Sequence, residues 1–146
     1  MHFADTLEIA APRAKVWAFL IDPQQVGSCG PGVESIEVID GTHFKAKAKV
    51  GVGFISARFT ITLEMAELHP PEQATIVARG QAPGSAVDAT AGMTLAELAS
   101  DRTRMDWSAD VNISGTIASV GARLIQGTAE KMINQTFECI RTKLEA

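Results

Sequence analysis

The spacing of apolar side chains changes from every second residue to about every 3.6 residues near the end of this chain. From Met105 to Ile113, apolar and polar residues alternate, which predicts a strand with one buried and one solvent-exposed face. After Gly115, apolar residues recur at helical spacing for roughly thirty residues. A one-sided strand followed by a long amphipathic helix constrains the fold, because each layer must bury its apolar face against the other. We therefore expect a sheet covered by one long C-terminal helix.

Turn signals divide the rest of the chain into similar short stretches. Stretches predicted as strands occur at residues 3–9, 33–40, 44–50, 55–65, 74–78 and 87–95. Pro12 and the pair Asp22-Pro23 suit helix starts, which predicts two short helices after the first strand. The sequence thus predicts a single α+β domain over residues 1–146, in which about seven antiparallel strands form a curved sheet around the long C-terminal helix.

Many of the side chains predicted to face inward are small. They include Ala46, Ala48, Ala57, Ala74, Ala78, Ala89, Ala91 and Ala109. A sheet and its covering layer lie about 10 Å apart, a gap that paired alanines cannot fill. Gly121, expected within the helix at a cost of about 1 kcal/mol relative to alanine, suggests that little bulk is wanted there. Two interpretations stay open: an interior cavity, which we favour, or a helix docked closely on the alanines.

Composition argues against several classes of function. A net charge of −4 and 5% aromatic residues without tyrosine do not suit a nucleic-acid-binding protein. The N-terminus lacks the basic and apolar segments of a signal peptide, and no run approaches the roughly 18 apolar residues of a membrane span. Cys29 and Cys139 are far apart and lack the spacing of a zinc or redox motif. We expect free thiols, no disulfide and a cytoplasmic location.

No catalytic or metal-binding set is predicted. His2, His43 and His69 fall at the chain start or beside turns, without a carboxylate or second histidine at ligand spacing. Asp5 shares the predicted inward face of the first strand. It is either a polar group inside a cavity or, as we favour, evidence of a register shift or a splayed chain start. No cofactor and no metal are expected.

The order of these elements resembles the helix-grip fold of START and Bet v 1-like proteins. More specifically, it resembles their CoxG-like branch, which takes its name from the CoxG subunit of carbon monoxide dehydrogenase. The resemblance extends over nearly the whole chain. The matching segments are Ala11-Pro12, Val16-Trp17, Cys29-Gly30-Pro31-Gly32-Val33, residues 51–59, residues 80–95, Ala109-Asp110-Val111 through Gly115, Gly121, and Arg123-Leu124-Ile125.

This resemblance implies an apolar cavity beneath the last helix and no catalytic residues. It also implies an accessory role beside a molybdenum hydroxylase of the carbon monoxide dehydrogenase type, with a quinone-like ligand and transient contact with a membrane surface. Many members carry a C-terminal extension toward the membrane. This chain stops at residues 143–146, directly after the predicted helix, so we expect no stable membrane anchor.

The leading hypothesis is a non-enzymatic carrier of a small lipophilic ligand. The residues predicted to bind the ligand are Phe59, Ile61, Leu63, Ala89, Ala91, Met93, Met105, Trp107, Leu124, Thr128 and Met132. The turn formed by Cys29, Gly30, Pro31 and Gly32 is the predicted cavity entrance. Two alternatives remain: an assembly or recruitment factor without a ligand, and a cyclase- or hydrolase-like enzyme in which Asp5 is the candidate polar group.

Overall fold

Seven antiparallel strands form one sheet in the spatial order β1-β7-β6-β5-β4-β3-β2 in the computed structural model, which describes residues 1–146. The strands are β1 (His2–Ile9), β2 (Val33–Val38), β3 (His43–Val52), β4 (Ile55–His69), β5 (Gln73–Ala82), β6 (Ser85–Ala99) and β7 (Arg102–Gly115). Helices α1 (Arg13–Leu20) and α2 (Pro23–Gly27) lie between β1 and β2 in the chain. The 3₁₀ helix η1 (Thr116–Val120) and α3 (Ala122–Glu145) follow β7. The predicted helix-grip architecture is confirmed.

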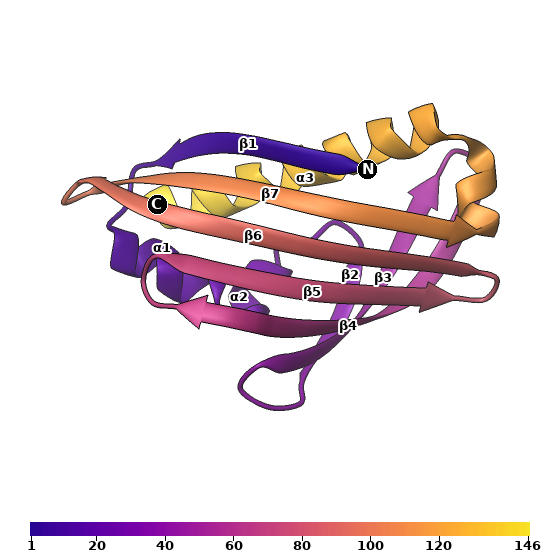
Figure 1. Cartoon of the computed structure of the whole chain (residues 1–146), viewed down its shortest axis with the longest axis horizontal. Helices are drawn as coiled ribbons and strands as arrows, with labels where there is room; N and C mark the ends of the chain where they lie inside the picture. The colour runs from indigo at the N-terminus through magenta and orange to yellow at the C-terminus, as the bar shows by residue number, and fades with distance from the viewer.

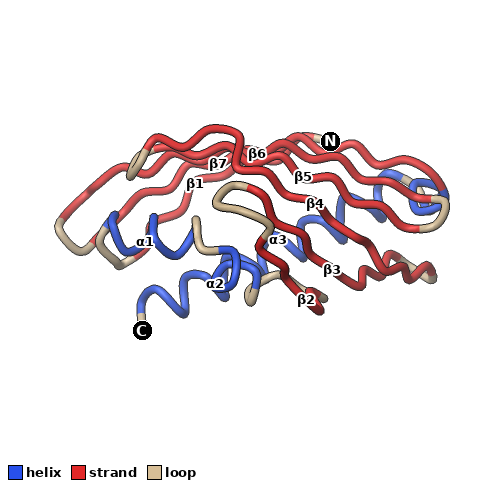
Figure 2. The backbone as a smooth tube through the Cα atoms, turned by 90° about the horizontal axis from the view of Figure 1, so that it is seen from below, coloured by secondary structure: helices blue, strands red, loops and turns tan.

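The sheet arches over α3, as Figure 2 shows. Apolar side chains of the strands, among them Phe59, Ile61 and Met105, pack or line a pocket between the sheet and the helices. Helices α1 and α2 lie beneath the end of the sheet at which α3 finishes, whereas η1 and the start of α3 lie at the opposite end (Figure 1). The concave face is therefore covered by α1, α2 and the end of α3 at one end, and by η1 and the start of α3 at the other. No helix has the combination of length and hydropathy needed to cross a membrane.

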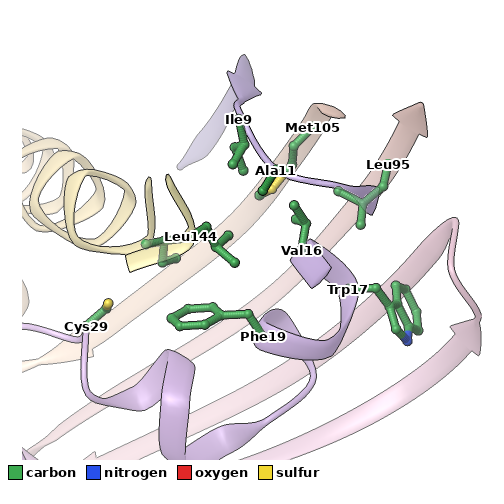
Figure 3. Close-up of a cluster of buried hydrophobic side chains, with 10 residues drawn as sticks. Ile9, Ala11, Val16, Trp17, Phe19, Cys29, Leu95, Met105 and Leu144 are labelled. Atoms are coloured by element: carbon green, nitrogen blue, oxygen red, sulfur yellow. The ribbon is translucent and has the colours of Figure 1, made fainter. Parts of the chain in front are cut away.

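The larger of two buried clusters fills the end that α1 covers (Figure 3). Its ten residues come from β1, the β1–α1 connection, α1, the turn before β2, β6, β7 and α3: they are Ile9, Ala11, Val16, Trp17, Phe19, Cys29, Leu95, Met105, Ile140 and Leu144. The smaller cluster, at the η1 end, contains Val52, Phe59, Ile117 and Ile125. The packed core is thus concentrated at one end of the concave face.

The expectation that Gly121 lies inside a continuous helix is wrong. The chain first forms η1, and Gly121 then precedes α3 with a φ of 102°. Residues with a Cβ rarely adopt such a φ, so the backbone requires glycine here for its conformation, not for its small size. In the first turn of α3 after this break, Leu124 is 44% exposed whereas Ile125 is buried.

The expectation of two free thiols is also wrong, because Cys29 and Cys139 form a disulfide. Their sequence separation of 110 residues gave no sign of this pairing. The fold places the turn before β2 against the second half of α3, where the two Cα atoms are 5.5 Å apart, within the range that a disulfide spans. The argument from free thiols for a cytoplasmic location therefore loses its basis.

Neither interpretation of Asp5 holds. β1 pairs with β7 in unbroken register from His2 to Ile9, with Asp5 opposite Trp107. Asp5 is exposed, and its Oδ1 accepts a hydrogen bond from the backbone N–H of Thr6. The side chain reaches solvent because β1 is an edge strand of the sheet.

Candidate ligand-binding pocket

A pocket of about 260 Å³ lies between the sheet and the N-terminal half of α3. Fifteen residues line it, of which 13 are hydrophobic. All four members of the smaller core cluster belong to this lining, which places the pocket at the η1 end. The pocket is therefore bounded by the sheet, η1 and α3, at the end away from α1 and α2.

Five of the predicted ligand-binding residues lie in this wall: Phe59, Ile61, Ala89, Thr128 and Met132. Six do not: Leu63, Ala91, Met93, Met105, Trp107 and Leu124. Met105 is a member of the large core cluster, and Met93 and Trp107 pack against it. The ring of Trp107 lies on that of Phe137, with 5.1 Å between centroids. The sheet residues nearer α1 thus contribute to packed core.

Sequence reasoning missed ten residues of the wall. They are Val50, Val52, Ala78, Gly80, Val87, Val111, Ile113, Ile117, Ile125 and Ala129. The signal for most of them was present, because the alternation that placed Ala89 inward also places Val87, Val111 and Ile113 inward. What alternation does not reveal is which end of the sheet the short helices fill.

Thr128 is the only polar side chain in the wall. Its hydroxyl Oγ1 donates a hydrogen bond to the backbone carbonyl oxygen of Leu124 at 3.0 Å, so this donor already has a partner. No titratable side chain lines the pocket. Such a surface favours contact with apolar groups and holds no group for proton transfer.

The main cluster with shifted pKa values lies elsewhere. The backbone N–H of Thr42 and the ring of His43 lower the pKa of Asp40 to about 2, and the hydrogen bond to Asp40 raises the pKa of His43. Both groups are exposed, Asp40 in the β2–β3 connection and His43 at the start of β3, at the opposite end of that strand from Val50 and Val52. No three histidine, cysteine or acidic residues are grouped as a metal site requires. This cluster stabilises a turn and does not reach the pocket.

The predicted entrance turn, residues 29–32, contributes nothing to the pocket wall. The disulfide fixes Cys29 to α3, and the carbonyl oxygen of Gly32 accepts a hydrogen bond from the backbone N–H of Lys49 at 2.9 Å. The turn is therefore attached to α3 at one end and to β3 at the other, which does not suit a segment that opens.

The family model for CoxG, a subunit of carbon monoxide dehydrogenase, matches residues 6–145. The chain belongs to the CoxG family. No curated protein sequence matches it. The membership agrees with the resemblance drawn from the turn and helix segments.

Solved structures share the fold of this CoxG family member. A conserved protein from Geobacillus kaustophilus has a TM-score of 0.91 at 22% identity, covering 99% of this chain and 95% of that chain. The Zhui aromatase/cyclase from Streptomyces sp. R1128 has a TM-score of 0.72 at 18% identity, with coverages of 99% and 93%. A START superfamily protein from Mycobacterium smegmatis has a TM-score of 0.74 at 12% identity, with coverages of 99% and 97%. At these identities the likeness shows the fold alone.

Proposed function

We propose that this CoxG family member is a non-enzymatic carrier that holds a small lipophilic molecule, quinone-like or lipid, in the pocket beneath α3. The observation that carries the proposal is the chemistry of the wall, in which 13 of 15 residues are hydrophobic and the one hydroxyl is bonded internally. A wall of this kind repels charged ligands, because it cannot replace their hydration.

The pocket volume limits the size of the ligand. At about 30 Å³ per water molecule, 260 Å³ corresponds to roughly nine waters, the size of a single ring or a short acyl segment. A ring of this size buries roughly 200 Å², which at about 25 cal/mol per Å² contributes about 5 kcal/mol before the costs of binding. The dissociation constant of such a fragment is therefore no tighter than about 0.2 mM, the value that 5 kcal/mol corresponds to before any cost is subtracted. A longer ligand would bind more tightly by extending beyond the pocket.

The proposed partner is a molybdenum hydroxylase of the carbon monoxide dehydrogenase type, and the support is family membership. We also propose transient contact with a membrane surface. Its support is Phe54, which lies in the β3–β4 turn and is 92% exposed. The alternative of an assembly or recruitment factor without a ligand would use the same surfaces and leave the pocket without a role.

An enzyme remains the weaker alternative. One solved structure with this fold is an aromatase/cyclase. In this chain no acid or base faces the pocket, and Asp5 is exposed on an edge strand. A proton-transfer mechanism in the pocket would therefore lack its catalytic group.

Ala89→Phe tests the carrier by filling the pocket. Ala89 lies in the wall between Ala78 and Val111 on the neighbouring strands, so a phenyl ring there takes up the space of a ring-sized ligand. We expect binding of the neutral fluorophore N-phenyl-1-naphthylamine to weaken at least about tenfold, the loss of roughly 1.4 kcal/mol of contact. Fluorescence titration gives the affinity.

Ala96→Phe is the matched control, because Ala96 is exposed on the opposite face of the same strand. This variant should bind the fluorophore as the wild type does, and circular dichroism should show that both variants fold. Undiminished binding by folded Ala89→Phe would contradict the carrier. If such a variant also still co-purified with a molybdenum hydroxylase, the assembly factor would be favoured.

A further inference from the structure

We propose that ligands enter and leave the pocket between the end of β3 and the first turns of α3, and that Leu124 controls this passage. The inference rests on the proposed carrier function and names the route to its site. It replaces the turn at residues 29–32, which is fixed at both ends.

The pocket wall has no second strand on one side of the end of β3. The pairing of β2 with β3 stops at Ala48, opposite Val33, so residues 50–52 have β4 on one side and no strand on the other. Val50 and Val52 both line the pocket, and α3 is the next element beyond them. No backbone hydrogen bond joins β3 to α3. Separating the two elements locally therefore breaks side-chain contacts only.

Leu124 covers this border from the helix side. A Cβ placed on Gly53 would lie 2.8 Å from Cδ2 of Leu124, so the leucine packs directly on the tip of the β3–β4 turn. One helical turn further, Thr128 lines both the pocket and a surface groove along α3 that also includes Leu124. The three other surface grooves of comparable size share no residue with the pocket. The wall between pocket and solvent is thus one side chain thick here.

The surroundings of this border suit a lipophilic molecule. Charged residues make up 21% of the chain, yet residues 50–57 contain none and residues 111–129 contain only Arg123. The groove along α3 beside Leu124 includes Arg123 and Lys131, so an apolar ligand approaches over residues 50–57, where it displaces no water from a charged group. At 44% exposure, Leu124 also has room to change rotamer without disturbing the core.

A side chain that lines the entry route without touching the bound ligand changes the activation barrier for entry and exit. It leaves the free energy of the bound state unchanged. Leu124→Ala should therefore raise the association and dissociation rate constants of N-phenyl-1-naphthylamine together, by at least about fivefold, with the dissociation constant within about twofold of wild type. Leu124→Trp should lower both rate constants. Stopped-flow fluorescence measures them. Leu98→Ala and Leu98→Trp are matched controls, because Leu98 is a leucine with 47% exposure near the end of β6.

Each outcome decides between the two proposals. Parallel rate changes in the Leu124 variants, with unchanged rates in the Leu98 variants, support the passage. Rates equal to wild type in all four variants overturn it and leave the carrier standing. A changed dissociation constant with an unchanged association rate constant would make Leu124 part of the binding site, which also overturns the passage. If the wild type binds no fluorophore, the carrier proposal itself fails.

Discussion

Gly115 ends β7 at a point where a side chain would not fit. Its φ is 86°, and a Cβ there would collide with the carbonyl oxygen of Gly84 and with Cα of Ser85. The carbonyl oxygen of Gly84 also accepts the backbone N–H of Thr116, at 2.8 Å. The β5–β6 turn and the start of η1 thus meet backbone to backbone, which places η1 against the end of the pocket.

Gly115→Ala should lower the free energy of unfolding by about 2 kcal/mol, because the new methyl group meets backbone and the φ is strained for alanine. Gly127→Ala is the matched control: Gly127 lies within α3, and nothing would lie within 4 Å of its Cβ. This second change should raise stability by roughly 0.5–1 kcal/mol, since alanine is the better helix former. Urea denaturation of both variants measures whether each change lowers or raises the free energy of unfolding. Equal effects would contradict the stated role of Gly115.

Alternation predicted the orientation of individual strand residues well. Phe59 and Ile61 point into the pocket wall, as expected. Met105 and Trp107 also lie on the concave face, but large side chains from α1 and α3 reach them there. A sequence pattern gives the face of the sheet on which a residue lies. Whether that face meets packed side chains or a pocket depends on contacts between segments that are distant in the sequence.

At the scale of elements, α3 is held at its two ends by different means. Its first turns meet η1 and the β3–β4 turn through side chains, whereas its second half is bound covalently to the turn before β2. Ile140 and Leu144 add buried contacts with α1 and β1. The helix is therefore anchored near its C-terminus and more weakly attached beside the pocket.

Removing the disulfide with Cys29→Ala and Cys139→Ala should lower the free energy of unfolding by about 2–4 kcal/mol, because the bond closes a loop of 110 residues in the unfolded chain. Urea denaturation with and without dithiothreitol measures the effect. Reductant should destabilise the wild type and leave the double variant unchanged. A wild type insensitive to reductant would show that the bond contributes nothing.

The break at Gly121 and the disulfide mark the limit of sequence reasoning for elements. Helical spacing after Gly115 predicted the long helix, yet it treated η1 and α3 as continuous and so placed Gly121 inside a helix. The cysteine pair left no local pattern, because its geometry arises only when α1 and α2 fold beneath the sheet. The succession of strands along the chain and the two short helices, by contrast, followed from turn residues and proline positions.

At the scale of the whole molecule, the two ends of the arched sheet differ in chemistry. The chain carries a net charge of −4, yet residues 50–57 and 111–129, at the pocket end, contain a single charged residue, Arg123. Phe54 extends from this end and is 92% exposed. An apolar ring beside an uncharged surface suits contact with the interface of a neutral lipid bilayer.

Phe54→Ser should weaken partitioning onto neutral phosphatidylcholine vesicles by roughly thirtyfold, because the phenyl ring loses about 2 kcal/mol of burial in the bilayer. Ile39→Ser is the matched control, since Ile39 is 58% exposed in the connection between β2 and β3 and lies outside the uncharged segments. Vesicle flotation measures both. If Phe54→Ser floats as the wild type does, this end of the molecule does not contact the bilayer.

The unpaired stretch of β3 also affects how copies of the chain behave toward one another. An edge that offers free peptide groups is a template on which a strand from a second molecule can add. Residues 50–52 form such an edge beyond the end of β2, and the neighbouring Lys49 is exposed and discourages a close second copy. Lys49 should therefore limit self-association at the same side of the molecule that admits the ligand, and a bound partner or bilayer would protect this edge further.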